Sequence, residues 1–184
     1  MAIGLWILFA ILALVVIMLI YYFNRLVLLS QRIKNSLSQI DVQLKKRSDL
    51  VPNLMETVKG YVKHEKSVMD SVTEARKALM GAGDIVHKMK AGNALESAIG
   101  RLFAIAENYP QLKANEGFVQ LQQELSAIED KIAYARQYYN DSILSYNTAC
   151  TTFPGLIFAK IFGKKEQEYI EIPESERAVP KVKF

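Results

Sequence analysis

The residue types that could perform catalysis or bind a metal are few in this chain, and their spacing suits neither task. His64 and Glu65 begin like the zinc-protease motif HExxH, but Val68 stands where the second histidine ligand is required. His87 lies in a lysine-rich stretch with no carboxylate or cysteine at ligand spacing. We therefore expect neither histidine to bind a metal, and we expect His64 to be an ordinary surface residue.

Two neighbouring carboxylates, one thiol and one glycine-rich turn complete the candidates for chemistry. Glu129 and Asp130 are adjacent on an expected helix, so their side chains point roughly 100° apart and do not form an acid and base pair. Cys150 has no histidine nearby in the sequence, which favours a buried, inert thiol. The turn GAGD at 81–84 lacks the GKS ending of a phosphate-binding loop. We expect no enzymatic activity, no cofactor and no metal.

The first element of the chain is a long apolar run. No charged residue occurs between Ala2 and Asn24, and spanning a hydrocarbon core as a helix takes about 20 apolar residues. The run is too long for a cleaved signal peptide and lacks that peptide's basic flank. Trp6 at one end and Tyr21 and Tyr22 at the other fit the two membrane interfaces. These features predict an uncleaved transmembrane anchor over residues 1–24.

The basic residues near this anchor predict its orientation. Arg25, Arg32 and Lys34 follow the run, and no lysine or arginine precedes it. Because basic flanks stay on the cytoplasmic side, we expect a single-pass protein of the cell (inner) membrane with its N-terminus outside and residues 25–184 in the cytoplasm. The single cysteine agrees with a reducing compartment.

The rest of the chain shows the periodicity of long helices. Apolar residues recur every three or four positions over 33–79, 95–106 and 118–153, and turn signals separate these stretches. This pattern predicts an all-α fold, in which the transmembrane helix is followed by an antiparallel up-and-down bundle of three to four long helices over residues 25–153. Residues 154–184 are expected to form a short apolar segment and a charged, flexible tail.

Two charged residues, Arg47 and Glu65, interrupt the first apolar stripe. Such residues either set the helix register or mark a break, and Pro52 favours a break after Arg47. If the chain reverses near Pro52, four helices return residue 153 to the membrane end, and the segment 156–162 can lie on the bilayer. If Pro52 only kinks the helix, three helices leave that segment far from the membrane. We favour the reversal.

Three groups of residues form the candidate surfaces for partners or membrane. The first cations after the anchor can contact headgroups, whereas Lys45 would stand about 30 Å above Arg25 on a perpendicular helix, so its cluster is an exposed patch or a partner site. Tyr138 lies on the last long helix, where tyrosines either pack in the core or form an interface. The apolar segment 156–162 supplies two phenylalanines for lipid. The candidate residues are Arg25, Arg32, Lys34, Lys45, Lys46, Arg47, Tyr138, Phe158 and Phe162.

Several long blocks of this sequence resemble the LemA family. They are FNRLV at 23–27, SQIDVQLKKRSDLVPNLMETVKGYVKHE at 38–65, NYPQLKANEGFVQLQQEL at 108–125, IAYARQYYNDSILSYN at 132–147 and TTFPGLIFAKIFG at 151–163. Leu37 and Gly117 depart from residues usual in the family, which affects local packing only. The resemblance implies a bacterial membrane protein with an N-terminal anchor and a helical bundle. It does not bring an enzymatic activity with it, because none is established for the family as a whole, and related proteins include some implicated in magnetosome formation.

These observations lead to two expectations for function. The first is a membrane-anchored interaction or scaffold protein that presents a helical surface and a basic stretch to protein partners. The second is an oligomer that shapes or organises the membrane surface. The expected partners are the lipid bilayer, one or more proteins and a second copy of the chain, and we expect no binding to nucleic acid.

Overall fold

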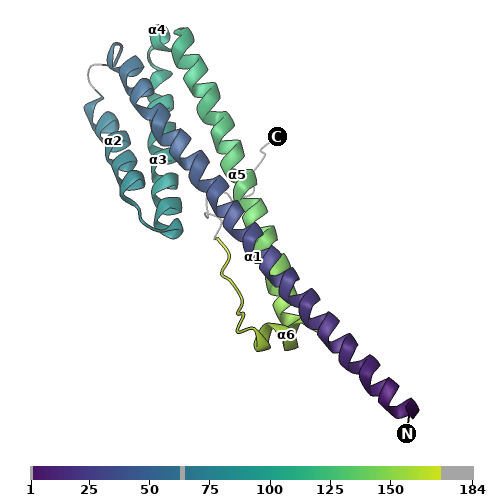
Figure 1. The fold of residues 1–184 in the computed structure, drawn as a ribbon. Helices are drawn as coiled ribbons and strands as arrows, with labels where there is room; N and C mark the ends of the chain where they lie inside the picture. Colours follow the sequence, from purple (N-terminus) through teal and green to yellow (C-terminus); the bar gives the residue numbers. More distant parts are fainter. Residues whose placement is uncertain (1, 63–64, 171–184) are drawn as a thin grey trace, which may run out of the picture. The chain divides into compact units, whose positions relative to one another are not determined.

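The computed structural model describes residues 2–62 and 65–170, and the regular structure of these residues is entirely helical, as predicted (Figure 1). The all-α class is therefore confirmed. Asp84 caps the third helix by accepting a hydrogen bond from the His87 amide at 3.0 Å, and Asn115 caps the fifth in the same way through Phe118. The helices are α1 (Ala2–Lys59), α2 (Lys66–Gly81), α3 (Ile85–Ala106), α4 (Pro110–Lys113), α5 (Glu116–Thr151) and α6 (Gly155–Ile161).

The chain forms two compact units, and α1 and α5 contribute to both. Unit 1 comprises residues 1–36 and 137–184, and unit 2 comprises residues 37–136. The core of unit 2 is built from the apolar stripes of α1, α2, α3 and α5, whose spacing the sequence analysis identified. Its fully buried members include Ile40, Leu54, Val72, Leu95, Leu102 and Ile132.

The apolar run at the start of α1 has the character of a membrane anchor. Within the described part of the chain, α1 contains the one stretch that is long and apolar enough to cross a membrane, and none of that stretch is buried in protein. A core helix of the same composition would be covered by other elements, which this run is not. The chain thus carries an N-terminal membrane anchor.

The expected reversal at Pro52 is wrong. Pro52 lies inside α1, which continues to Lys59, and the chain turns back only between α1 and α2. A proline inside a helix leaves the carbonyl four residues earlier, here that of Ser48, without its amide donor. The Arg76 side chain on α2 supplies the replacement, since its Nε donates to the Ser48 carbonyl at 2.8 Å. This contact explains how the helix tolerates its proline.

Candidate membrane-interface site

The short helix α6 packs against the last residues of the apolar run. Phe158 stacks on Tyr22 with ring centroids 4.9 Å apart, and Phe162 meets Phe23 edge to face at 5.3 Å. The segment 156–162 therefore returns to the end of the anchor, as expected for four long helices, although the turn that makes this possible follows Lys59. Whether α6 contacts the bilayer stays a prediction.

The exposed apolar residues of α6 differ from the two phenylalanines predicted to contact a membrane. Phe158 is buried and Phe162 is half-buried, because their rings pack on Tyr22 and Phe23, so neither is free to face lipid. The exposed apolar side chains of α6 are those of Leu156, Ile157 and Ile161.

Gly155 allows α6 to begin so close to α5. A Cβ at this position would collide with the Ala149 carbonyl oxygen and lie 3.2 Å from Cε1 of Tyr22. Any side chain would therefore displace the first turn of α6 from both neighbours. This requirement gives the FPG stretch at 153–155 a structural role beyond ending α5.

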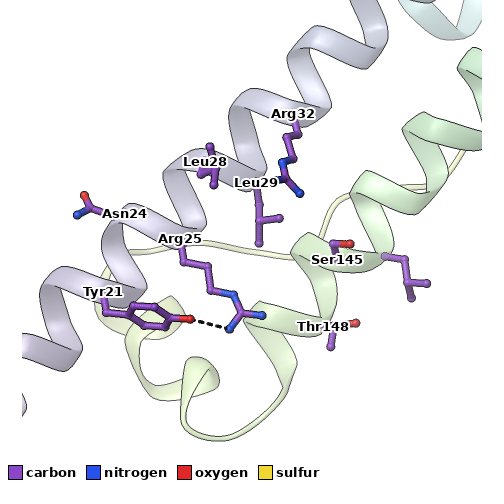
Figure 2. Close-up of a pocket in the computed structure, with 9 residues that line it drawn as sticks. Tyr21, Asn24, Arg25, Leu28, Leu29, Arg32, Ser145 and Thr148 are labelled. Atoms are coloured by element: carbon purple, nitrogen blue, oxygen red, sulfur yellow. Dashed lines mark hydrogen bonds between the residues drawn. The ribbon is translucent and has the colours of Figure 1, made fainter.

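An open groove of about 750 Å³ lies beside α1 just after the apolar run (Figure 2). Arg25 and Arg32 are seven residues apart on α1, so both side chains project on one face, roughly 10 Å apart along the axis. The Arg25 guanidinium donates to the Tyr21 hydroxyl at 3.5 Å. The lining residues are Tyr21, Asn24, Arg25, Leu28, Leu29 and Arg32 of α1 with Leu144, Ser145 and Thr148 of α5.

The groove is positively charged without a compensating carboxylate. None of its lining residues is acidic, and over residues 2–62 and 65–170 neither Arg25 nor Arg32 forms an ion pair. Lys34, the third predicted cation, is exposed and does not line the groove. The structure thus joins two of the three juxtamembrane cations in one site.

Two asparagines of α5 hold the segment after α6 by its main chain. The Asn147 side chain donates to the Gln167 carbonyl and accepts from the Gln167 amide, both at 2.9 Å. The Asn140 side chain makes the same pair of bonds with Ile170, both at 3.1 Å. This role was not predicted, although the two asparagines are seven residues apart and therefore share a helix face.

The tyrosines of α5 divide between core and surface. Tyr139 and Tyr146 are buried, as their stripe positions predicted, and burial raises the pKa of Tyr146 to about 12. Cys150 is buried, as predicted, and this burial raises the pKa of its thiol, which disfavours the nucleophilic thiolate. Tyr138 is 44% exposed, so core packing does not account for it, and its role in an interface stays a prediction.

Arg47 is not part of an exposed basic patch, contrary to the prediction. Its side chain is only 2% exposed, forms an ion pair with Glu129 and lies 3.7 Å from Glu96. It also donates to the Gly92 carbonyl at 3.2 Å. Burial lowers the pKa of Arg47 to about 10, so the guanidinium remains charged at neutral pH. Arg47 links α1 to α3 and α5 and does not mark a helix break. Glu65, in contrast, does lie at a helix break, because it is the residue directly before α2.

Lys45 and Lys46 remain exposed, and Lys45 borders a second groove in unit 2. This groove, which we call the α1–α2–α3 groove, has a volume of about 340 Å³. Two ion pairs flank it, Lys45 with Asp49 at 3.1 Å and Lys88 with Asp41 at 2.8 Å. Its lining residues are Asp41, Val42, Leu44, Lys45, Ser48, Asp49, Leu79, Met80 and Lys88.

The remaining candidates for chemistry form no catalytic constellation in the part of the chain that the structure describes. Nδ1 of His87 lies 2.6 Å from an Asp84 carboxylate oxygen, so a carboxylate does stand at interacting distance, contrary to the sequence analysis. Hydrogen bonds from His87 lower the pKa of Asp84. Over residues 2–62 and 65–170, however, no three potential ligands gather around a metal position. His64 lies outside the described residues.

Comparison with known proteins identifies the family of the chain and several relatives. A family model described as the LemA family matches residues 36–184. The chain is 28% identical over 177 residues to the magnetosome protein MamQ of Magnetospirillum gryphiswaldense, covering 82% of this chain and 65% of that protein. It is 26% identical over 179 residues to magnetosome protein MamQ 2 of Paramagnetospirillum magneticum, covering 83% and 66%. It is 28% identical over 172 residues to protein LemA of Metamycoplasma hominis, covering 85% and 78%. The chain thus spans just under two thirds of the length of the two magnetosome relatives.

Proposed function

The chain belongs to the LemA family, and from that premise we propose that it is a non-catalytic, membrane-anchored helical module that holds a protein partner at the membrane. Its anchor, the first part of α1, fixes the chain to the bilayer. The partner binds the α1–α2–α3 groove of unit 2. Both acidic and basic residues line this groove, which favours a protein over anionic lipid headgroups as its occupant.

The composition of the α1–α2–α3 groove is the observation that carries this proposal. Val42 and Met80 are 50% and 64% exposed, although both are apolar and line the same groove. Methionine adapts to varied apolar partners, and charged residues around an apolar centre are typical of protein interfaces. The two ion pairs Lys45–Asp49 and Lys88–Asp41 provide such a rim.

Placing carboxylates in this groove tests the proposal. We expect the double variant Val42→Asp, Met80→Asp to retain at most about a tenth of the partner that co-purifies with the full-length protein, because binding would bury unpaired charges. The measurement is quantitative mass spectrometry of proteins cross-linked in native membranes. Val86→Asp is the matched control, since Val86 is an exposed valine of α3 outside the groove. Equal recovery of all partners by both variants would contradict the groove assignment.

A second function, in which the protein shapes the membrane surface as an oligomer, is favoured by α6. Ile157 and Ile161 are exposed on a helix that packs beside the end of the anchor, and three relatives are named magnetosome proteins. In the same set of variants, Ile157→Asp with Ile161→Asp separates the two functions. If α6 acts on lipid, this pair changes the diameter of vesicles reconstituted with full-length protein while partner recovery stays at the wild-type level.

We also propose that the N-terminus lies outside the inner membrane and that residues 25–184 are cytoplasmic. The cations Arg25, Arg32 and Lys34 on one flank of the anchor support this orientation. Added protease is expected to spare a C-terminal tag in cells whose outer barrier has been removed, and to digest it after lysis. Digestion before lysis would reverse the orientation and move the partner search to the cell exterior.

A further inference from the structure

We propose that the groove between α1 and α5 in unit 1 is a binding site for the phosphate headgroup of an anionic phospholipid. The groove contains Arg25 and Arg32, and its other polar groups come from Tyr21, Asn24, Ser145 and Thr148 (Figure 2). The proposal rests on the membrane anchor and is independent of the α1–α2–α3 groove, so the two assignments can fail separately.

Charge identifies the ligand as an anion. The two guanidinium groups share one face of α1, and no carboxylate lines the groove or pairs with either of them in the described part of the chain. Arginine binds phosphate through two parallel N–H donors, which a lysine ammonium does not provide. Arg25 is also oriented by its bond to the Tyr21 hydroxyl, which leaves its other donors available.

Position identifies the source of the phosphate as a lipid. The groove begins at Tyr21, within the last residues of the apolar run, and ends at Arg32. This stretch directly follows the hydrocarbon-spanning segment, which is the level of phospholipid phosphates. A free anion from solution would meet the same cations, but it would make no use of the apolar side chains described next.

Shape supports a lipid as well. Leu28 and Leu29 of α1 and Leu144 of α5 add apolar surface to the lining of the groove, suited to the glycerol and first methylenes of a phospholipid. Leu28 and Leu144 are both more than half exposed, so covering them with the apolar part of a lipid would remove apolar surface from water and favour binding. The volume of about 750 Å³ lies within the roughly 300–1,000 Å³ typical of ligand sites.

The test measures lipid retained by purified full-length protein in a neutral detergent. The probe is phosphatidylglycerol, offered together with phosphatidylcholine, and native mass spectrometry counts the bound molecules. We expect Arg25→Gln with Arg32→Gln to lower phosphatidylglycerol retention about tenfold or more, given the contribution of each cation near a membrane surface. Lys34→Gln with Lys160→Gln removes the same charge from exposed sites outside the groove and should retain wild-type binding.

Further variants make each outcome decisive. Ser145→Phe fills the groove without changing charge, and loss of phosphatidylglycerol in this variant supports a defined site. Equal losses in the groove and control pairs would show diffuse attraction and overturn the proposal. So would displacement of the lipid by millimolar inorganic phosphate, which would identify a free anion as the ligand. Thermal unfolding by circular dichroism confirms folding of each variant. Partner recovery by the same variants, cross-linked in native membranes, reports on the α1–α2–α3 groove separately.

Discussion

Replacing Arg47 with alanine is expected to lower the free energy of unfolding by about 3 kcal/mol, the lower end of the range for breaking a buried ion pair. The Arg47 side chain is 2% exposed and contacts groups on two other helices, the Glu129 carboxylate and the Gly92 carbonyl. Its loss leaves a cavity beside a carboxylate without its partner. The lower end applies because the Glu129 side chain is 30% exposed and can recover some hydration.

The Arg47 prediction is checked by urea unfolding of the full-length protein in detergent, followed by helical circular dichroism. Arg47→Met keeps most of the volume and removes the charge, so we expect it to cost less than the alanine variant. Lys46→Ala is the control, since an exposed neighbour should change stability by less than about 0.5 kcal/mol. Equal stabilities of the Arg47→Ala and Lys46→Ala variants would show that the buried contacts contribute nothing.

Replacing Arg76 with alanine is expected to cost about 1.5–3 kcal/mol, but only while Pro52 is present. The Arg76 Nε donates to the Ser48 carbonyl, which Pro52 deprives of its helical partner. In a Pro52→Ala background the new amide can bond to Ser48, so the Arg76 side chain becomes dispensable. We therefore expect a coupling of about 1 kcal/mol or more between the two positions.

A double-mutant cycle measures this coupling directly. The four proteins are wild type, Pro52→Ala, Arg76→Ala and the combination, each unfolded under the same conditions. Lys77→Ala is a suitable control, because it removes an exposed cation next to Arg76 on the same helix. If Arg76→Ala costs the same with and without the proline, the hydrogen bond does not compensate for Pro52.

The fold was predictable wherever a single helix carried its own signal. The anchor follows from an uncharged run and α5 from an unbroken apolar stripe. Helix α5 has nearly the bounds that its stripe over 118–153 predicted. The continuation of α1 through Pro52 was not predictable, because the Ser48 carbonyl is compensated by Arg76 on the next helix, 28 residues after Ser48. The burial of Arg47 agrees with its position on the apolar stripe, but its partners lie on other helices, so its charge and the nearby proline suggested a break instead.

The candidate sites were predictable only in part, because each combines residues of α1 with residues from segments far away in the sequence. Arg25 and Arg32 were identified by their proximity to the anchor, but the contribution of Ser145 and Thr148 depends on the return of α5 to that level. The packing of Phe158 on Tyr22 likewise joins residues more than a hundred positions apart. The interaction between Asp84 and His87 could have been predicted from the sequence, because the carboxylate and the imidazole are three residues apart at the start of a helix.

The way Asn140 and Asn147 hold residues 167–170 sets which substitutions that segment can accept. Each asparagine side chain hydrogen-bonds only to the main chain of Gln167 or Ile170, donating to its carbonyl and accepting from its amide. Side-chain identity at these two positions therefore matters little to the attachment, and sequences of quite different composition can occupy it. Proline is the exception at both positions, because it has no amide hydrogen to give.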